Sequence, residues 1–409
     1  MTERPDDLLI LLVGSNPLPN YLAGCALRPN RIALVFTKET KDAKDRLRDQ
    51  LAQTLVDKVR FEDVWVDDAT CSTEVRRVID RLMSSDGNRD VSLHYTGGTK
   101  IMAVHARMAF KCGKGKPERA SYLDEGGKEN PPRLRFDSNT SKLLSEYPTV
   151  RLDLKSLLAL HGIAHEPRKP KDPAPTLADA RDILCKGLEN VPLLDTLYEE
   201  RKRLEKFGNP KNAVSNPFRA NCFGLTLSLS EFPTNVQLEG LESADKKKSW
   251  FKQWYSFIGG EWLEDWLGGQ IRALAKDLNL DLEKDITIGV NAKRIGAKKE
   301  DPPMEIDLSV VCGHRSYFVS CTTDTTKRQC KSKLFEMSVR SRQLGGDLAR
   351  AALVCLADDG TVSALQSDIN DVWGATNTTK VFGLSDIRDW SDFGGKQPNR
   401  CSLKQWLES

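Results

Sequence analysis

The segment VSLHYTGGTK, residues 91–100, is a short apolar run that ends in a Gly-Gly turn, and a run of helical character from Ile101 to Cys112 follows it directly. A strand that passes through such a turn into a helix presents free backbone N–H groups and the positive end of the helix dipole. Thr96, Thr99 and Lys100 add two hydroxyls and an ammonium group to this turn. The segment therefore predicts a loop that binds phosphate.

A second loop of related character lies near the N-terminus, where the apolar run from Leu8 to Val13 leads into GSNPLPN, residues 14–20. In an open parallel sheet, ligands bind outside the carboxyl ends of the strands, so two such loops on one domain predict one nucleotide-like ligand. Neither loop matches G-x-x-x-x-G-K-[ST] or G-x-G-x-x-G, which disfavours an ATPase and a nicotinamide dehydrogenase. A Gly-Gly turn with a purely steric role is the alternative interpretation.

Together, VGSNPLPNYLA (residues 13–23) and HYTGGTKIMAVHA (residues 94–106) resemble the two ligand loops of the CARF domain, the Rossmann-like sensor of cyclic oligoadenylates in type III CRISPR effectors. The resemblance covers roughly residues 1–160 and implies a homodimer whose two TGGTK loops face a ring-shaped ligand, with cyclic tetra-adenylate favoured. By this resemblance, the ligand-binding candidates are Ser15, Asn16, Thr96, Gly97, Gly98, Thr99 and Lys100.

Composition excludes several other classes of protein. Lys and Arg number 61 against 58 Asp and Glu, so any recognition of phosphate is local rather than the work of a global basic field. The mean hydropathy of -0.46 and the lack of an apolar run of about 18 residues argue against a membrane span, and the start lacks the pattern of a secretory signal. We therefore expect a cytoplasmic protein. The ten cysteines form no C-x-x-C pair, which disfavours zinc.

The pattern of strands and helices predicts an α/β fold in two domains. In the first 160 residues or so, apolar runs alternate with amphipathic helices in a βαβαβα series, which is typical of a mostly parallel sheet covered on both faces. The runs Ala120 to Leu123 and Arg133 to Phe136 suggest that the sheet ends in antiparallel strands. The five histidines form no metal-binding grouping and are each expected to be structural or merely exposed; His94, beside the TGGTK turn, is the one that would contact a ligand if any does.

A proline-rich and charged stretch, EPRKPKDPAP, marks the boundary of the N-terminal domain. We expect a CARF domain at residues 1–165, a linker and helical region at 166–258, and a third region at 259–409. The third region shows the order αβββαβ. The chemistry of residues 207–245 is not readable from their sequence.

This third region resembles the PD-(D/E)xK nuclease domain that CARF effectors carry, because GGEWLE (residues 259–264) opens its first helix and MEIDL (residues 304–308) lies on a strand. The resemblance implies a restriction-endonuclease-like fold and a site for Mg²⁺ or Mn²⁺. In this chain Asp307 matches the strand aspartate, and Glu264 matches the helix glutamate that assists in metal binding.

The chain departs from this pattern on the next strand. Where the family reads E-C-K-T, this chain reads SCTT, so that Ser320 replaces the acidic ligand and Thr322 replaces the lysine. A hydroxyl is a poor substitute for a carboxylate on Mg²⁺, and threonine supplies no positive charge. Candidate substitutes are Asp324 as a ligand, Glu305 beside Asp307, and an ammonium group from Lys327, Lys331 or Lys333.

The sequence leaves open whether the protein is an enzyme. The first hypothesis is a CARF effector in antiviral defence, in which cyclic oligoadenylate allosterically controls a metal-dependent endonuclease that cleaves DNA or RNA. The second is a regulator whose nuclease-like domain is catalytically silent and docks nucleic acid or protein, and Ser320 and Thr322 favour it. A third, more remote hypothesis is a ring nuclease that cleaves the bound ligand with the help of Thr99 and Lys100.

Overall fold

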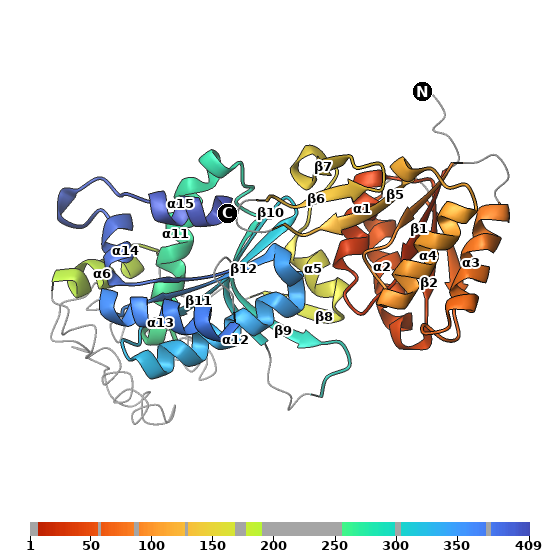
Figure 1. The fold of residues 1–409 in the computed structure, drawn as a ribbon. Helices are drawn as coiled ribbons and strands as arrows, with labels where there is room; N and C mark the ends of the chain where they lie inside the picture. Colours follow the sequence, from red (N-terminus) through yellow and green to blue (C-terminus); the bar gives the residue numbers. More distant parts are fainter. Residues whose placement is uncertain are drawn as a thin grey trace, which may run out of the picture.

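The computed structural model describes residues 7–55, 59–85, 90–126, 130–167, 177–189, 256–298, 304–373 and 378–409. This part of the chain forms two sheets that lie side by side, each with helices on both faces (Figure 1). The predicted α/β class is confirmed, with a Rossmann-like N-terminal region and a second sheet. No helix among the described residues is both long enough and apolar enough to cross a membrane.

The N-terminal sheet has the strand order β3-β2-β1-β4-β5-β6-β7. Its strands are β1 (Leu8–Leu12), β2 (Arg31–Phe36), β3 (Arg60–Trp65), β4 (Val91–His94), β5 (Ala120–Asp124), β6 (Arg133–Phe136) and β7 (Ser141–Leu143). The strands β1 to β5 are parallel, and β6 and β7 are antiparallel. The order reverses between β1 and β4, and this switch point is where open α/β sheets bind ligands.

The antiparallel part of the sheet begins one strand later than the sequence suggests. Ala120 on β5 lies opposite Leu93 on β4 in a parallel pair, because the helix between these two strands carries the chain back to the start of the sheet. The antiparallel turn then follows between β5 and β6, where Asp124 lies opposite Arg133.

Five helices cover the N-terminal sheet: α1 (Leu18–Leu27), α2 (Lys41–Thr54), α3 (Ser72–Ser85), α4 (Lys100–Cys112) and α5 (Leu154–Leu160). Every residue of β1 is buried, as a strand covered on both faces requires. Leu9 and Leu11 pack with α1, α2 and α5, whereas Leu8 and Ile10 pack with α3 and α4 on the other face. Ala43, Leu47 and Leu51 lie on the buried face of α2.

The second sheet has the order β13-β12-β11-β10-β9-β8. Its strands are β8 (Ile163–Pro167), β9 (Ile286–Arg294), β10 (Met304–Cys312), β11 (Arg315–Thr322), β12 (Ala349–Cys355) and β13 (Thr379–Phe382). One face carries α6 (Leu177–Glu189), α11 (Trp262–Leu278), α14 (Leu384–Trp390) and α15 (Cys401–Glu408), and the other face carries α12 (Lys327–Gly345) and α13 (Asp359–Trp373). The predicted order αβββαβ is confirmed from α11 to β12.

The two sheets share one apolar core. Ile163 on β8 pairs with Arg294 on β9, so the chain already enters the second sheet three residues before position 166. A continuous cluster joins Leu9 on β1, through α5, to Phe318 on β11 and Leu344 on α12. Of the region 166–258, the helix α6 is described, and residues 190–255 lie outside the described residues.

Candidate functional site

The two predicted ligand loops touch each other at the switch point between β1 and β4. A Cβ atom on Gly14 would lie 3.0 Å from the backbone nitrogen of Gly98, and one on Gly97 would lie 2.0 Å from the carbonyl oxygen of Leu12. Gly98 also has a φ of +75°, which favours glycine. The close approach of the two backbones therefore requires the glycines that the sequence places there.

Asn20 holds the end of β1 against the TGGTK turn, and the sequence did not identify it as a site residue. Its Nδ2 donates a hydrogen bond of 2.8 Å to the carbonyl oxygen of Leu12, the same oxygen that a Cβ on Gly97 would meet. Asn20 is fully buried, and its Oδ1 has no hydrogen-bond partner. The feature of the sequence that could have identified Asn20 is its position as the last, polar residue of GSNPLPN. In the structure this residue lies in the first turn of α1.

Both threonine hydroxyls of the TGGTK turn are engaged within the protein. Thr99 caps α4, since its Oγ1 accepts the Met102 N–H at 3.1 Å and donates to the Ala69 carbonyl at 3.2 Å. The Oγ1 of Thr96 accepts the Leu123 N–H at 2.6 Å. The groups that remain for an anion are the backbone N–H groups of Lys100 and Ile101, at the start of α4, and the exposed ammonium group of Lys100.

The loop after β1 brings a second helix N-terminus to the same edge of the sheet. The Oδ1 of Asn16 accepts the Leu18 N–H at 3.0 Å where α1 begins, and Ser15 is exposed beside it. Because β1 and β4 are parallel neighbours, the helices that follow them both start at the carboxyl edge of the sheet. Two positive dipole ends therefore lie near each other there.

His94 does not reach this site, which agrees with the expectation that the histidines are structural. The side chain is fully buried under the turn, and its Nδ1 lies 3.1 Å from Ser121 Oγ. Burial lowers the pKa of His94 to about 3, which keeps the ring neutral at pH 7. The side chain of a residue on β4 points into one of the two helix layers that cover the sheet. His94 is therefore buried even though it is close to the TGGTK turn in the sequence.

A second candidate site surrounds Asp307 on β10. The register places Leu308 opposite Val319, so Asp307 faces Ser320 on β11. Its Oδ2 accepts hydrogen bonds from Ser320 Oγ at 3.0 Å and from the Cys321 N–H at 2.7 Å. The serine that replaces the expected acidic ligand is thus a donor that holds the aspartate in place.

Asp307 lines a cavity of about 260 Å³ together with Glu305, Ser320, Lys333, Glu336, Met337 and Arg340. Of the four catalytic candidates, Asp307 lines this cavity, whereas Glu264, Asp324 and Lys327 do not. Glu264 lies in the first turn of α11, and Asp324 accepts a hydrogen bond of 3.2 Å from Thr322 Oγ1.

The three candidate lysines of α12 lie at two different places, beside Asp368 and in the Asp307 cavity. Lys327 and Lys331 place their Nζ atoms 3.1 and 3.0 Å from Asp368 Oδ2 on α13. Lys333, which the sequence offered as a third choice, lines the Asp307 cavity instead. Of the three candidate lysines, Lys333 is therefore the one that shares a cavity with Asp307.

The residues around Asp307 do not assemble the metal site that the resemblance implies. In the part of the chain that the structure describes, no three His, Cys, Asp or Glu side chains are grouped as metal ligands. Within the cavity, Arg340 pairs with Glu336 and donates to the Glu305 carbonyl at 2.9 Å. The carboxylates there are thus balanced by arginine and lysine rather than gathered for Mg²⁺ or Mn²⁺.

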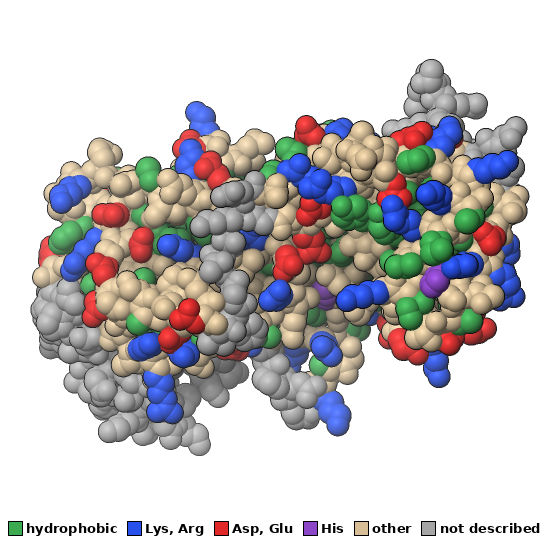
Figure 2. Space-filling model, viewed as in Figure 1, with side chains coloured by type: hydrophobic (Ala, Val, Ile, Leu, Met, Phe, Trp, Pro, Cys, Tyr) green, Lys and Arg blue, Asp and Glu red, His purple; other side chains and the backbone are tan. Residues whose placement is uncertain are grey.

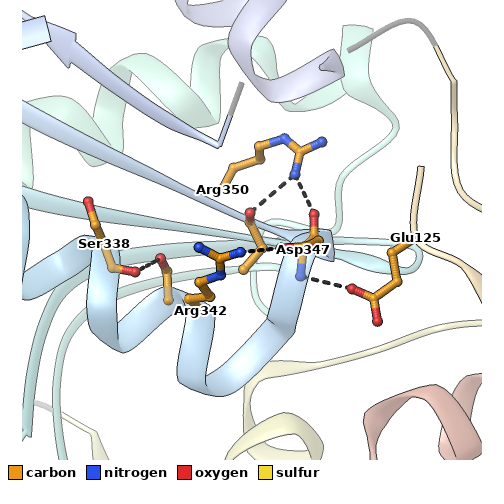
Figure 3. Close-up of polar contacts among 7 residues, drawn as sticks. Glu125, Ser338, Arg342, Asp347 and Arg350 are labelled. Carbon is orange, nitrogen blue, oxygen red and sulfur yellow. Dashed lines mark hydrogen bonds and ion pairs between the residues drawn. The ribbon is translucent and has the colours of Figure 1, made fainter. Parts of the chain in front are cut away.

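The turn that follows α12 contacts Glu125 of the N-terminal domain (Figure 3). The Oε2 of Glu125, which follows β5, accepts the Asp347 N–H at 2.9 Å. A Cβ on Gly346 would lie 3.1 Å from this oxygen and 3.6 Å from Asn16 Nδ2. Burial raises the pKa of Glu125, and the Asp347 N–H opposes that shift. The same helix therefore lines the Asp307 cavity and ends close to the predicted ligand loop that contains Asn16.

No family model and no curated protein matches this chain. Solved structures similar to it include the following three. The protein VC1899 from Vibrio cholerae has 15% identity and a TM-score of 0.68, with 98% of each chain covered. Can2 from Sulfobacillus thermosulfidooxidans, solved in complex with cyclic tetra-adenylate, has 16% identity and a TM-score of 0.63, with 98% of this chain and 100% of Can2 covered.

The third is a type III CRISPR defence DNA nuclease activated by cyclic oligoadenylate, with 17% identity and a TM-score of 0.50, and the match covers 86% of this chain and 45% of that one. At these identities the similarity concerns the fold. It extends over both sheets of this chain, because almost the whole length is matched in VC1899 and Can2.

Proposed function

We propose that this chain is a sensor of cyclic oligoadenylate of the type III CRISPR kind, with a C-terminal domain that holds nucleic acid without cleaving it. One observation carries the proposal: two glycine loops touch at the switch point of a Rossmann-like sheet, beside two helix N-termini and the exposed Lys100. Backbone N–H groups with an added ammonium group suit the phosphates of such a ligand. The fold of Can2, solved with cyclic tetra-adenylate, supports the choice of ligand.

The experiment that tests this proposal is calorimetric titration with cyclic tetra-adenylate, with cyclic hexa-adenylate and linear oligoadenylate as comparisons. Binding of a cyclic form with one ring per two chains is the expected result. Absence of heat with each ring would reject the sensor, whatever the C-terminal domain does.

A homodimer follows from the same proposal, because a ring with rotational symmetry fits across two identical loops. The exposed face of α4 supports it: Ile101, Val104 and Met108 are 38%, 54% and 45% exposed and lie at helical spacing next to Lys100. Figure 2 shows hydrophobic side chains gathered over α4. We therefore propose that the helix after the TGGTK turn lies at the two-fold axis.

We expect Val104→Asp to convert a dimer into a monomer, since a carboxylate at the most exposed apolar position of α4 would be desolvated at the axis. Light scattering should give twice the chain mass of 45.8 kDa for the parent and the single mass for the variant. Leu282→Asp, at a residue that is 45% exposed in the second domain, is the matched control and should remain dimeric. A parent that is monomeric with and without ligand would reject the dimer.

The contact between Gly346 and Glu125 supports allosteric control. Asn16, a candidate ligand-binding residue, lies beside Gly346, which directly follows α12, so a ligand there could shift the position of this helix. Gly346 has a φ of +58°, so alanine would be strained and would press on Glu125. We expect Gly346→Ala to keep ligand binding but to reduce the effect of cyclic tetra-adenylate on nucleic acid affinity. Coupling between two sites is typically about 5- to 150-fold, and it should fall to a small part of its parental value.

The measurement is fluorescence anisotropy of a labelled oligonucleotide with and without the ring. Gly394→Ala is the matched control, since Gly394 has a φ of +68° and its Cβ would meet nothing within 4 Å. Equal coupling in the parent, Gly346→Ala and Gly394→Ala would show that this contact carries no signal.

A nuclease is the second candidate function. Asp307, Glu305 and Lys333 share one cavity, and a carboxylate beside an ammonium group suits phosphoryl chemistry. The hydrogen bonds from Ser320 and Cys321 to Asp307, together with Thr322 in place of the motif lysine, favour the non-cleaving function.

A further inference from the structure

Two cavities are lined by α12 together with strands of the second sheet. The Asp307 cavity adjoins a second cavity of about 610 Å³, and Arg340 lines both. The second cavity is lined by His161, Ile163, Ala292, Lys293, Arg294, Ala297, Met304, Arg340, Gln343 and Leu344. From Lys333 to Leu344, successive turns of α12 therefore line first one cavity and then the other. We call the two cavities together the α12 groove.

Charge is distributed unevenly along the α12 groove. The second cavity is lined by Lys293, Arg294 and Arg340, and its described lining contains no aspartate or glutamate. Arg294 is exposed at the end of β9, and Arg340 is fixed by its hydrogen bond to the Glu305 carbonyl. Burial lowers the pKa of His161, so its ring adds no charge at pH 7. One end of the groove therefore attracts anions, and the other end holds Asp307.

We infer that the α12 groove binds the phosphodiester backbone of a single nucleic acid strand, which passes from Lys293 and Arg294 towards Asp307. This inference rests on the proposed function, since it names the site where the C-terminal domain holds its polymer. Lys333 and Leu344 are eleven positions apart on the helix, a length of about 16 Å at about 1.5 Å per residue. This length is enough to place several consecutive phosphates of a single strand beside the helix.

The lining also predicts how the strand is recognised. Neither cavity is lined by a described Phe, Tyr or Trp on which bases would stack. Lysine and arginine contacts to phosphate carry no sequence information, and they release counterions. Binding in the α12 groove should therefore be tolerant of sequence and strongly dependent on salt.

The test is fluorescence anisotropy with fluorescein-labelled oligo(dT) and oligo(U), each about 15 nucleotides long, in the presence of cyclic tetra-adenylate and over a series of NaCl concentrations. Lys293→Ala with Arg294→Ala should weaken binding and reduce the slope of log K against log salt by about 1.4, because each phosphate of a single strand that the protein neutralises adds about 0.7 to that slope. Oligo(dT) and oligo(U) distinguish a DNA strand from an RNA strand.

The matched control removes two positive charges from the opposite edge of the same sheet. Lys380 lies on β13 and Arg388 on α14, and both are exposed. Lys380→Ala with Arg388→Ala should leave the slope at its parental value. If the double groove variant unfolds, Arg294→Ala alone, at an exposed strand end, should still reduce the slope by about 0.7.

Equal slopes in the groove variants and the control would overturn the inference. It would also be overturned if the parent bound neither oligonucleotide while calorimetry still showed binding of cyclic tetra-adenylate. In that case the proposed sensor function would be retained and the nucleic acid site would be rejected. Loss of the cyclic tetra-adenylate signal in the parent would instead reject the proposed function, which separates the two failures.

Discussion

Lys100→Ala is expected to weaken the binding of cyclic tetra-adenylate by about 1.5 to 3 kcal/mol, which is more than tenfold. The reason is that Thr96 and Thr99 use their hydroxyls for Leu123 and for the cap of α4, so Lys100 is the charged side chain left to the TGGTK turn. An ammonium group at the N-terminus of a helix adds to the anion site formed by the backbone N–H groups. Calorimetry measures the change directly.

Lys111→Ala is the matched control for this prediction. Lys111 is exposed and lies in the last turn of the same helix, so the charge of α4 changes equally in both variants. We expect the control to bind the ring with parental affinity, since its ammonium group lies at the far end of α4. Parental affinity in Lys100→Ala as well would mean that the phosphates lie elsewhere and would remove the TGGTK turn from the site.

Much of the N-terminal fold could be predicted because its signals are local. Strands buried on both faces appear in the sequence as continuous apolar runs. In the helices between them, apolar residues recur every three or four positions. The first turn of α1 was missed because Pro17 and Pro19 flank Leu18 in a segment that reads as a loop, although proline is well tolerated where a helix begins.

The choice between the lysines of α12 could not be predicted from the sequence. Lys327 and Lys331 are four residues apart and share one face of the helix, which packs towards Asp368 on α13. Lys333 lies two residues further on and projects from another face, into the Asp307 cavity. The rotation of the helix on the sheet decides between them, and packing of residues such as Leu334 sets that rotation.

The site residues Glu125 and Arg340 were missed for a related reason. Glu125 is 222 positions away from Asp347 in the sequence, and Arg340 is 35 positions from Glu305. No local pattern marks such pairs, because they meet through the docking of two sheets and of a helix on a strand. The loops at the switch point could be predicted, whereas the contacts that link them to α12 required the tertiary structure.

The parent protein is expected to cleave neither DNA nor RNA, and Ser320→Glu combined with Thr322→Lys is expected to create Mn²⁺-dependent cleavage. Ser320 already lies 3.0 Å from Asp307, so a glutamate there would bring a second carboxylate to the first. Thr322 is two residues further along β11 and projects on the same side of the strand. A lysine at 322 would thus restore the spacing that the nuclease pattern requires.

The thermal stability of this double variant gives a readout that does not depend on cleavage. Two carboxylates in close contact repel each other, so without metal the double variant should melt at a lower temperature than the parent. Mn²⁺ should reverse this loss, since a ligand at about a hundred times its Kd stabilises a folded protein by about 2.7 kcal/mol. The parent, which lacks the second carboxylate, should show little shift.

Asp307→Ala decides between the two functions of the C-terminal domain. In the double variant it should abolish both the cleavage and the Mn²⁺ shift, because one carboxylate of the restored pair is then absent. If the parent itself cleaves when cyclic tetra-adenylate is bound, and Asp307→Ala or Lys333→Ala stops it, the nuclease function holds and the cavity shared by these two residues is its active site. Cleavage that persists in Asp307→Ala would place the chemistry outside this cavity.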